Sequence, residues 1–263
     1  MGQQVSEQEV QLYDVAVPDW PGEIDFYRAM TREVKERGGS ILEVGCGTGR
    51  VALQLAQEGI SIVGMDISPS MITTARQKSQ ELTNVRWVEG DMLSFGLGEC
   101  FDLIIIPGHS YQFMLTPEDQ LACLYCISQH LTPHGKLVLH INHDDLSWLG
   151  GLAEGRGTDF KLKGEYRQEA AQGSVRAWVA WSYDSGTQTA SAIDAWEFIR
   201  EDGKVVERKE SAPKRLHVVF PFEMKHLLAR AGFEIEALYG DFFQHELQNA
   251  SPDMIWVARA KQS

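Results

Sequence analysis

Residues 41–50 read ILEVGCGTGR, an apolar segment that runs into three alternate glycines. The apolar side chains are typical of a central strand in a parallel sheet, which is buried on both faces. Glycines let the backbone turn sharply and approach a ligand closely, because no Cβ is in the way. Residues 50–56 continue as a helix, whose N-terminal amides can hold a negative group. The stretch therefore predicts an α/β sheet with a ligand-binding loop after one of its central strands.

The spacing of the glycines narrows the choice of ligand. Gly45, Gly47 and Gly49 form a G-x-G-x-G pattern, whereas a dinucleotide-binding turn has G-x-G-x-x-G and would need a glycine where Arg50 stands. Glu43, two residues before the first glycine, would repel a pyrophosphate but could attract an ammonium group. A zwitterionic ligand therefore fits this loop better than a dinucleotide does.

A second anchor for the ligand follows the second predicted strand, residues 60–65. This strand ends in Asp66, about 20 residues after the first glycine, where a carboxylate can accept hydrogen bonds from a ribose diol. The sequence that follows, ISPS, also has the chemistry of a helix cap, and Asp66 could serve only that cap. With the glycine loop so near, we expect the ribose role.

Two further strands end at the same edge of the predicted sheet. Residues 85–89 leave the sheet at Gly90, Asp91 and Met92, where a carboxylate could accept a purine amine while a thioether packs on the ring. A Gly-Asp pair alone is more often a simple turn. Residues 101–106 form the fourth strand, and the polar loop 107–112 after it is where the reacting atom should lie.

Together these segments resemble the successive motifs of class I S-adenosylmethionine-dependent methyltransferases. The motifs are E-x-G-x-G-x-G at 43–49, Asp66, GDM at 90–92, FDL at 101–103 and LTPHGKL at 131–137. The resemblance implies an α/β fold: a Rossmann-like, seven-stranded sheet with helices on both faces and the last strand antiparallel. It also implies that S-adenosylmethionine is the cofactor and S-adenosylhomocysteine the product.

The resemblance also assigns places to the parts of the cofactor. The methionine moiety should lie over residues 45–49, with Glu43 reaching its ammonium group through a water, the ribose on Asp66, and the adenine beside Ile67, Asp91 and Met92. The predicted cofactor-binding residues are Tyr13, Trp20, Glu43, Gly45, Cys46, Gly47, Gly49, Asp66, Ile67, Met71, Gly90, Asp91, Met92 and Pro107.

Aromatic residues precede the glycine loop, as in bacterial methyltransferases of small molecules, whose N-terminal segment closes over the cofactor. We expect residues 1–35 to form such a helical lid, with Tyr13 and Trp20 as its contacts. Phe26 and Tyr27 fall in a predicted helix, so they could line the pocket or simply pack in the core.

For the chemistry, an amine or hydroxyl acceptor must lose a proton as it takes the methyl group. His109 in the loop after the fourth strand is the first candidate base, and Tyr111 is the second. The histidines and acids at 140–145 do not have the spacing of a compact metal motif, so no metal is expected. Catalysis by positioning alone also stays open.

We expect one methyltransferase domain, residues 1–263, with an insertion. Its Rossmann-like core should comprise residues 36–143 and 217–263, resuming the sheet at 218–221 and ending in an antiparallel pair at 234–240 and 254–260. Residues 144–216 contain four strand-like runs separated by turn signals, which predict a small antiparallel sheet that acts as a substrate lid. Four aromatic residues on this insert could pack the small sheet or form a cage for a cationic amine: Trp178, Trp181, Tyr183 and Trp196.

Composition excludes several classes of partner. The chain has 37 acidic and 24 basic side chains, a formal net charge of −13, which disfavours nucleic acid and favours neutral or cationic small molecules. It has no apolar run long enough to suggest a membrane span. Its four cysteines have no disulfide or metal pattern, so we expect a reducing, cytoplasmic setting. We also expect a monomer or homodimer.

Three alternatives to a small-molecule methyltransferase remain. One is a nicotinamide-dependent dehydrogenase, which titration with S-adenosylhomocysteine against NAD would distinguish. Another is a protein that binds S-adenosylmethionine without catalysis, and the third is a methyltransferase acting on a macromolecule, either protein or tRNA. The sequence leaves open both the acceptor and the type of atom that is methylated.

Overall fold

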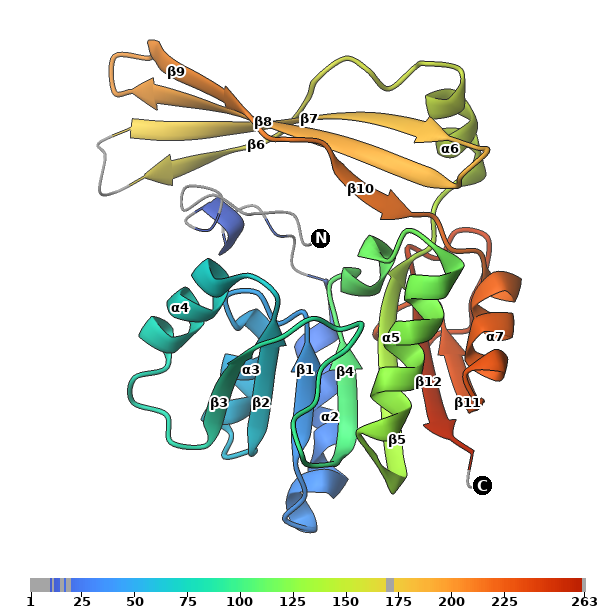
Figure 1. The fold of residues 1–263 in the computed structure, drawn as a ribbon. Coiled ribbons are helices and arrows are strands. Elements are labelled where there is room, and N and C mark those ends of the chain that lie inside the picture. The colour runs from blue at the N-terminus through green and yellow to red at the C-terminus, as the bar shows by residue number, and fades with distance from the viewer. Residues whose placement is uncertain (1–9, 11, 15–16, 18–19, 169–172, 262–263) are drawn as a thin grey trace. The chain divides into compact units, whose positions relative to one another are not determined.

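The computed structural model describes residues 10, 12–14, 17, 20–168 and 173–261. The chain divides into two compact units. The first, here called the core unit, comprises Met1–His143 and Val219–Ser263, and the second, called the insert unit, comprises Asp144–Val218. Each unit is built on its own sheet (Figure 1).

The core unit contains a seven-stranded sheet with the order β11-β12-β5-β4-β1-β2-β3. All neighbouring strands pair in parallel except those involving β12, which is antiparallel to both β5 and β11. This arrangement confirms the predicted Rossmann-like sheet with its antiparallel last strand. The strands are β1 (Ile41–Val44), β2 (Ile62–Asp66), β3 (Val85–Glu89), β4 (Phe101–Ile106), β5 (Leu131–Asn142), β11 (Phe233–Tyr239) and β12 (Asp253–Ala260).

Strand β1 lies in the middle of this sheet, between β2 and β4. All four of its residues are buried, the charged Glu43 as well as the three apolar ones, and Ile41 pairs with Ile62 on one side and Leu103 on the other. The connections run in opposite directions from β1 and β4, so the loops after these two strands diverge. In open α/β sheets such a switch point is where ligands bind.

Helices cover both faces of the sheet (Figure 1). Apolar side chains of α5 and α7 pack in one hydrophobic cluster, and those of α2, α3 and α4 pack in another. Local sequence sets where the helices start: Ser68 and Thr116 cap α4 and α5, each followed by a proline at the first helical position. The helices are α2 (Glu23–Glu36), α3 (Arg50–Gln57), α4 (Pro69–Lys78), α5 (Pro117–Gln129) and α7 (Pro221–Arg230), and a 3₁₀ turn η1 spans Ser110–Phe113.

The return from the insert differs from the prediction. Residues 218–220 form no strand, so the expectation that the sheet resumes at 218–221 is wrong. Phe220 instead caps α7, and its backbone N–H donates to Glu223 Oε2 at 3.3 Å. Pro221 explains the difference, because a proline has no N–H for a strand ladder but fits the first position of a helix.

The insert unit is a five-stranded antiparallel sheet in which β8 pairs with β7, β9 and β10. The antiparallel sheet is confirmed, and it contains one more strand than the four predicted runs. Its elements are α6 (Leu146–Ala153), β6 (Lys161–Gln168), β7 (Gly173–Asp184), β8 (Thr189–Arg200), β9 (Val205–Glu210) and β10 (Lys214–His217).

The aromatic residues of the insert do not share one face of its sheet. Trp178 pairs with Ala195, whereas Trp196 pairs with Ala177, so the alternation of side chains places the two indoles on opposite faces. Trp181 packs edge-on against Trp148 of α6 at 5.5 Å between ring centroids. A single cage made of all four predicted aromatic residues is therefore wrong.

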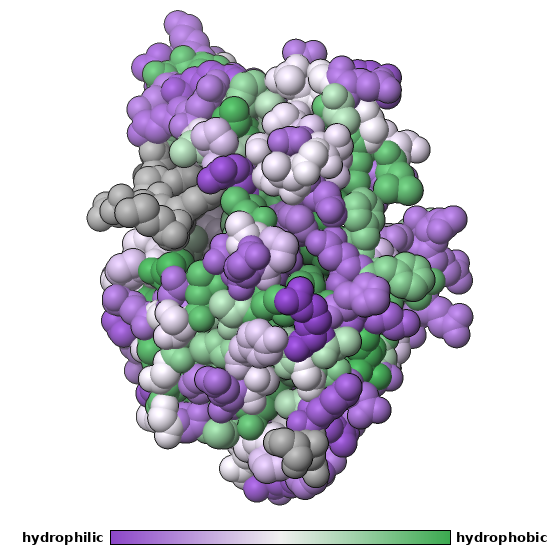
Figure 2. All heavy atoms as spheres, turned by 45° about the vertical axis from the view of Figure 1, so that its right-hand side comes forward, coloured by the Kyte–Doolittle hydropathy of each residue, from purple (hydrophilic) through white to green (hydrophobic). Residues whose placement is uncertain are grey.

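No described helix is long and apolar enough to cross a membrane. Figure 2 shows one face of the molecule, on which hydrophilic and hydrophobic residues are interspersed. The most exposed aromatic side chains among the large apolar residues that the structure describes are Phe222, at 75%, and Phe243, at 62%.

Candidate active site

The glycine loop connects β1 to α3 and is held against the end of β2. Gly45, Gly47 and Gly49 all have left-handed backbone conformations, with φ of 72°, 55° and 84°. The N–H groups of Gly45 and Cys46 both donate to the carbonyl of Met65, at 2.7 and 3.0 Å. Cys46 is buried, and this burial raises the pKa of its thiol well above the ordinary value, so it is held as a neutral thiol.

Each glycine of the loop is required by a different neighbour. A Cβ on Gly49 would lie 2.5 Å from the indole of Trp87, and one on Gly45 would lie 2.8 Å from the side chain of Ser110. A Cβ on Gly47 would lie 3.1 Å from the hydroxyl oxygen of Tyr13. The predicted lid residue Tyr13 therefore lies beside the glycine loop.

Asp66 joins the glycine loop to the end of β2. Its Oδ2 accepts a hydrogen bond from Gly47 N–H at 2.8 Å, and its Oδ1 accepts one from Ser68 N–H at 2.9 Å. Burial raises the pKa of the carboxyl, and these backbone donors oppose that shift. Asp66 thus organises the turn before α4 as well as standing at the position predicted for the ribose, while its neighbour Ile67 is 45% exposed.

The end of β3 lies next to Asp66, as predicted. Gly90 N–H donates to the Asp66 carbonyl at 3.0 Å, and Asp91 Oδ1 accepts from Leu93 N–H at 3.0 Å. The terminal carbon of Met92 lies near Gly45, 3.7 Å from where a Cβ would be. Met71, in contrast, is buried within the first turn of α4 at 6% exposure. The structure therefore brings together the predicted adenine and methionine anchors, but packs Met71 in the interior.

Glu43 is a buried carboxyl on β1, with 2% of its surface exposed. Burial raises its pKa to about 8, and the opposing effects of Arg50 and of a hydrogen bond from the Ala52 backbone are smaller. Its Oε2 has no hydrogen-bond partner among the described residues. Such a group stays protonated unless a positive charge approaches it.

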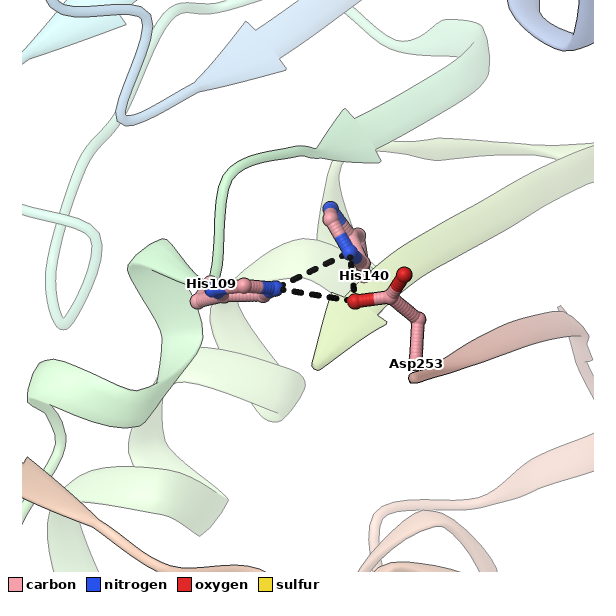
Figure 3. Close-up of side chains that lie close together, drawn as sticks. All are labelled: His109, His140 and Asp253. Carbon is pink, nitrogen blue, oxygen red and sulfur yellow. Dashed lines mark hydrogen bonds and ion pairs between the residues drawn. The ribbon is translucent and has the colours of Figure 1, made fainter. Parts of the chain in front are cut away.

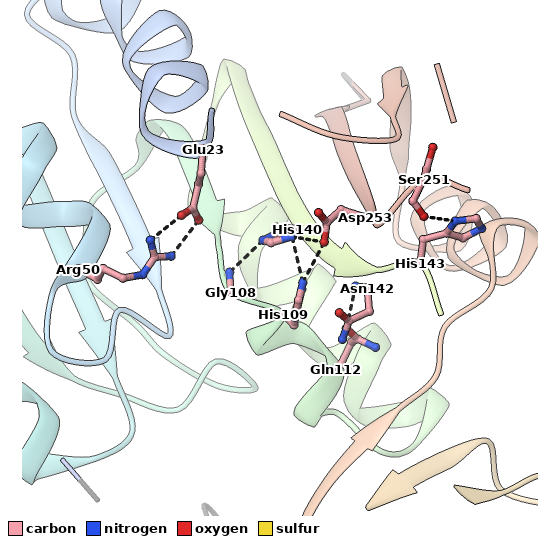
Figure 4. A network of polar contacts seen from close by, with 10 residues as sticks. All are labelled: Glu23, Arg50, Gly108, His109, Gln112, His140, Asn142, His143, Ser251 and Asp253. Atoms are coloured by element: carbon pink, nitrogen blue, oxygen red, sulfur yellow. Dashed lines mark hydrogen bonds and ion pairs between the residues drawn. The ribbon is translucent and has the colours of Figure 1, made fainter. Parts of the chain in front are cut away.

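A second buried carboxylate, Glu23, was not predicted. It begins α2 and forms a two-point ion pair with Arg50, the residue directly after the third glycine (Figure 4). The Arg50 guanidinium also lies 5.0 Å from the ring centroid of Trp20. The N-terminal segment is thus attached to the glycine loop through Trp20, Glu23 and Arg50. Phe26 and Tyr27 lie in the hydrophobic core, which favours the packing interpretation of both.

The loop after β4 contacts the glycine loop directly. Ser110 Oγ lies 3.0 Å from the carbonyl of Pro107 and 3.4 Å from that of Gly45. His109 adopts a left-handed conformation with φ of 64°, which is uncommon for a residue other than glycine. The imidazole is partly buried, with 15% of the side chain exposed.

Tyr111 lies outside this site. Its side chain is fully buried in the hydrophobic core, and its hydroxyl donates to the Gln120 carbonyl at 3.1 Å. Burial raises its pKa well above the ordinary value of a phenol. A base must reach its substrate, so this placement argues against Tyr111 as the second candidate base.

His109 meets two partners that the sequence did not connect with it (Figure 3). His109 Nε2 lies 3.0 Å from His140 Nε2 and 3.3 Å from Asp253 Oδ1, and His140 Nε2 lies 2.9 Å from the same Oδ1. His140 is fully buried on β5, and Asp253 begins β12. Trp20 packs edge-on against both imidazoles, with ring centroids 5.1 and 5.0 Å away.

The surroundings assign a charge to two members of this cluster. Burial lowers the pKa of His140 to about 4, so His140 is neutral at neutral pH. Hydrogen bonds from the two histidines lower the pKa of Asp253 to about 2 in spite of its burial, so this residue is a carboxylate. A negative charge therefore lies directly against His109 Nε2.

The same three side chains have the composition of a metal site, since one ligand atom from each lies within 4.8 Å of the others. Their hydrogen bonds do not fit a metal. Gly108 N–H donates to His140 Nδ1 at 3.3 Å, which requires the proton of the neutral ring to be on Nε2. A protonated Nε2 cannot bind a metal ion, but it can donate to Asp253.

The polar residues at 140–145 are otherwise dispersed. His143 Nδ1 donates to the Ser251 carbonyl at 2.8 Å, and Asn142 N–H donates to Gln112 Oε1 at 3.0 Å (Figure 4). Asp145 caps α6 by accepting from Trp148 N–H at 2.7 Å. His140 is thus the member of this segment that reaches His109.

Comparisons with known proteins agree with this geometry. Residues 41–135 match a family model described as a methyltransferase domain. The chain is 23% identical over 225 residues to YqeM of Bacillus subtilis (strain 168), whose name assigns it to the methyltransferases, covering 84% of each chain. It is 28% identical over 121 residues to dTDP-3-amino-3,4,6-trideoxy-alpha-D-glucopyranose N,N-dimethyltransferase of Streptomyces venezuelae, covering 46% of this chain and 50% of the relative.

The fold is also similar to solved structures. The CcbJ methyltransferase from Streptomyces caelestis superimposes with a TM-score of 0.76 and 22% identity, covering 100% of both chains. The glycine loop, the strand order and the matched domain thus all identify the same kind of protein. Residues 41–135 thus form a methyltransferase domain, and the chain has the fold of the class I S-adenosylmethionine-dependent methyltransferases.

Proposed function

We propose that this methyltransferase acts on an amine or hydroxyl group of a small molecule, with His109 as the base that takes the acceptor's proton. The observation that carries the proposal is the position of His109. It lies in the loop after β4, whose Ser110 contacts the glycine loop, and its imidazole is backed by a buried carboxylate. A base in this place lies beside the region where the methyl group should be.

The bound cofactor supplies a methyl group on a positively charged sulfur. An acceptor lone pair would form a bond to the methyl carbon as the carbon–sulfur bond breaks, with the electron pair of that bond left on the sulfur. A neutral amine then carries a positive charge and an attached proton, and a hydroxyl oxygen likewise has one proton too many. His109 would remove this proton, a contribution typically worth about 10²- to 10⁴-fold in rate.

The proposal places the cofactor on the residues that converge at the carboxyl edge of β1, β2 and β3. The glycine loop and Glu43 would hold its amino-acid moiety, and Asp66 would hold its ribose. Support comes from the free Oε2 of Glu43 and from the contact of Asp66 with Gly47 N–H. Ile67, Asp91 and Met92 would surround the adenine.

An amine on a small molecule is the acceptor that we favour. The relative from Streptomyces venezuelae is named as an N,N-dimethyltransferase of an amino sugar nucleotide. The net charge of −13 would also disfavour nucleic acid and attract cationic molecules.

We further propose that residues 1–35 close over the cofactor and that the insert, residues 144–216, selects the acceptor.

The test is transfer of a labelled methyl group from S-adenosylmethionine to a panel of amines and alcohols that includes amino sugars and their nucleotides. With an acceptor in hand, His109→Ala should reduce turnover about 10²- to 10⁴-fold and leave the affinity for S-adenosylhomocysteine nearly unchanged. His134→Ala is the matched control, since this histidine is exposed near the opposite end of β5.

Full turnover by His109→Ala would contradict the assigned base. Tight binding of S-adenosylhomocysteine with no transfer to any member of the panel would favour a binding protein without catalysis. Transfer to added protein or tRNA, but to no member of the panel, would favour a macromolecular acceptor.

A further inference from the structure

The cluster around His109 joins residues that are far apart in the sequence. Asp253 is 144 residues from His109 and 113 residues from His140. Strand β12 inserts between β5 and β11, and its pairing of Asp253 with Asn142 brings the carboxylate to the end of β5. The carboxylate, 8% exposed, is directed at the two imidazoles (Figure 3).

The position of the His140 proton follows from the group that donates to its ring. Gly108 N–H occupies His140 Nδ1, so the His140 proton is on Nε2 and points to Asp253 Oδ1 at 2.9 Å. His109 Nε2 lies 3.0 Å from this protonated nitrogen and 3.3 Å from the carboxylate oxygen. When His109 Nε2 also bears a proton, both N–H groups donate to the same Oδ1, and the 3.0 Å approach of the two nitrogens is then not itself a hydrogen bond. His109 Nδ1 is then left with a free lone pair.

We infer that Asp253 and His140 are positioning residues that hold His109 as the Nε2–H tautomer, so that Nδ1 is the atom that accepts the proton. The inference rests on the proposed role of His109. After proton transfer His109 would be positively charged, and the carboxylate at 3.3 Å would stabilise this charge. His140 acts as a neutral donor that fixes the position of Asp253 Oδ1.

Other charged groups are arranged around the cluster without replacing Asp253. Glu23 on α2 has an electrostatic effect on His109, but both of its oxygens are paired with Arg50. Arg50 on α3 disfavours a charge on His140. Trp20 and Phe242 pack edge-on against the ring of His140, at 5.0 and 4.8 Å between centroids. His140 is therefore enclosed by aromatic rings and kept neutral, while Asp253 is the carboxylate that reaches His109.

The first test reads the tautomer and does not need an acceptor. Imidazole nitrogen chemical shifts, measured by NMR on protein with ¹⁵N-labelled histidine at pH 7.5, distinguish Nε2–H from Nδ1–H. The His109 and His140 signals can be assigned with the His109→Gln and His140→Gln variants. Both rings should be Nε2–H in the wild type. In Asp253→Asn, the amide can donate to His109 Nε2, so His109 should shift towards the Nδ1–H form.

The second test separates the roles by kinetics. Asp253→Asn should lower kcat about 10²-fold, with little change in KM for the acceptor or in the affinity for S-adenosylhomocysteine. Its pH–rate profile should also differ from that of the wild type, because the carboxylate that faces the charged His109 imidazole is gone. Asp102→Asn is the matched control: this carboxylate accepts from Ser40 N–H and Thr132 at the opposite edge of the sheet. It should leave both rate and profile unchanged.

The outcomes distinguish this inference from the proposed function. If His109→Ala is impaired but Asp253→Asn has the turnover rate, pH–rate profile and His109 tautomer of the wild type, the inference about Asp253 is wrong. The role of His109 as the base is then unaffected. If Asp253→Asn changes the tautomer but neither His109→Ala nor Asp253→Asn loses activity, the base is wrong, and with it the role inferred for Nδ1. Loss of activity in EDTA with recovery on adding Zn²⁺ would overturn the inference in favour of a metal site. Should Asp253→Asn fail to fold, His140→Gln tests the same arrangement through the position of Oδ1.

Discussion

Arg50 forms a bidentate ion pair with Glu23. Its two terminal guanidinium nitrogens lie 2.5 and 2.9 Å from the two carboxylate oxygens. The Glu23 side chain is 1% exposed and that of Arg50 is 17% exposed. The pair links the first turn of α2 to the first residue of α3. It therefore couples the N-terminal segment to the glycine loop through charge rather than through a shared apolar surface.

The first prediction concerns this ion pair. Glu23→Gln should lower the free energy of unfolding by about 2 to 4 kcal/mol, because it leaves a mostly buried guanidinium without its carboxylate. Denaturation in urea measures the change. Glu33→Gln is a matched control on the same helix, since the Arg37–Glu33 pair is exposed at both ends and should contribute less than about 1 kcal/mol. Equal effects of the two substitutions would show that burial of the Arg50 pair adds nothing.

The second prediction concerns Asp66. Asp66→Ala should weaken binding of S-adenosylhomocysteine by about 10- to 150-fold, because hydrogen bonds to a charged group contribute roughly 1.5 to 3 kcal/mol. Calorimetry measures the affinity. The substitution also removes the acceptors for Gly47 and Ser68, so a control for the turn is needed.

Ser68→Ala supplies that control. Ser68 Oγ accepts from Met71 N–H at the start of α4, so its loss perturbs the same turn without removing the carboxylate. It should cost about 1 kcal/mol of stability and leave the affinity close to that of the wild type. An equal loss of affinity in both variants would mean that Asp66 acts on the turn rather than on the ribose.

The sequence predicts the parts of this protein that depend on local patterns. The strand and loop at residues 41–50, Asp66 at the end of β2, and the Gly90–Met92 turn all arise from short segments with regular spacing. Parallel strands present their carboxyl ends at one edge, so the order of the motifs along the chain was enough to bring them together. The same reasoning identified the loop that carries His109.

The parts that the sequence does not predict depend on pairing between distant segments. Asp253 reaches His109 only through the register of β12 against β5, and Glu23 reaches Arg50 only through the packing of α2 on α3. Neither residue lies in a motif. Tyr111 shows the same limit within a loop: it follows His109 by two residues, yet the 3₁₀ turn directs its ring into the core. A signal was available for Asp253, because it is an acid directly before the apolar run at residues 254–258.

The third prediction separates the functions of two glycines. Gly49→Ala should mainly reduce stability, because its Cβ would lie 2.5 Å from the buried Trp87 ring, at a φ of 84°. Gly47→Ala should have a smaller effect on stability and a larger one on binding, since its nearest neighbour is the Tyr13 hydroxyl at 3.1 Å. Thermal unfolding and S-adenosylhomocysteine titration of both variants give the two measures. The assignment fails if both glycines show the same ratio of lost stability to lost affinity.

The fourth prediction is a pH dependence that comes from Glu43. Its pKa in the folded protein is about 8, above the ordinary 4.5, so the folded state keeps a proton that the unfolded state has lost. Stability must therefore fall as pH rises through this window. His140 has the opposite sign, because its pKa is lowered from 6.5 to about 4 and its contribution rises with pH only up to about 6.5.

Above the ordinary pKa of histidine the contribution of His140 no longer changes with pH, and comparison with a Glu43 variant then reports on Glu43. Between pH 6.5 and pH 8 the wild type should lose about 1 to 2 kcal/mol of stability through this residue. Glu43→Gln keeps the shape but has no proton to lose, and it should be flatter over the same interval in urea denaturation. If both proteins show the same slope, the loss of stability has another source.

The fifth prediction links the same proton to cofactor binding. Near pH 7 Glu43 is protonated in the free protein, and the ammonium group of S-adenosylhomocysteine should lower its pKa by favouring the carboxylate, directly or through a water. Binding should then release up to about one proton. Calorimetry in phosphate and in Tris detects the released proton, because the two buffers take up a proton with different heats. The apparent binding enthalpy should therefore differ between the two buffers for the wild type and agree for Glu43→Gln.

Methylthioadenosine, which keeps the nucleoside but lacks the amino-acid moiety, is the matched ligand and should release no proton from either protein. Equal enthalpies for S-adenosylhomocysteine in the two buffers would show that the ammonium group does not change the protonation of Glu43. Proton release by methylthioadenosine would instead assign the linkage to the nucleoside, and hence to Asp66, whose pKa burial raises.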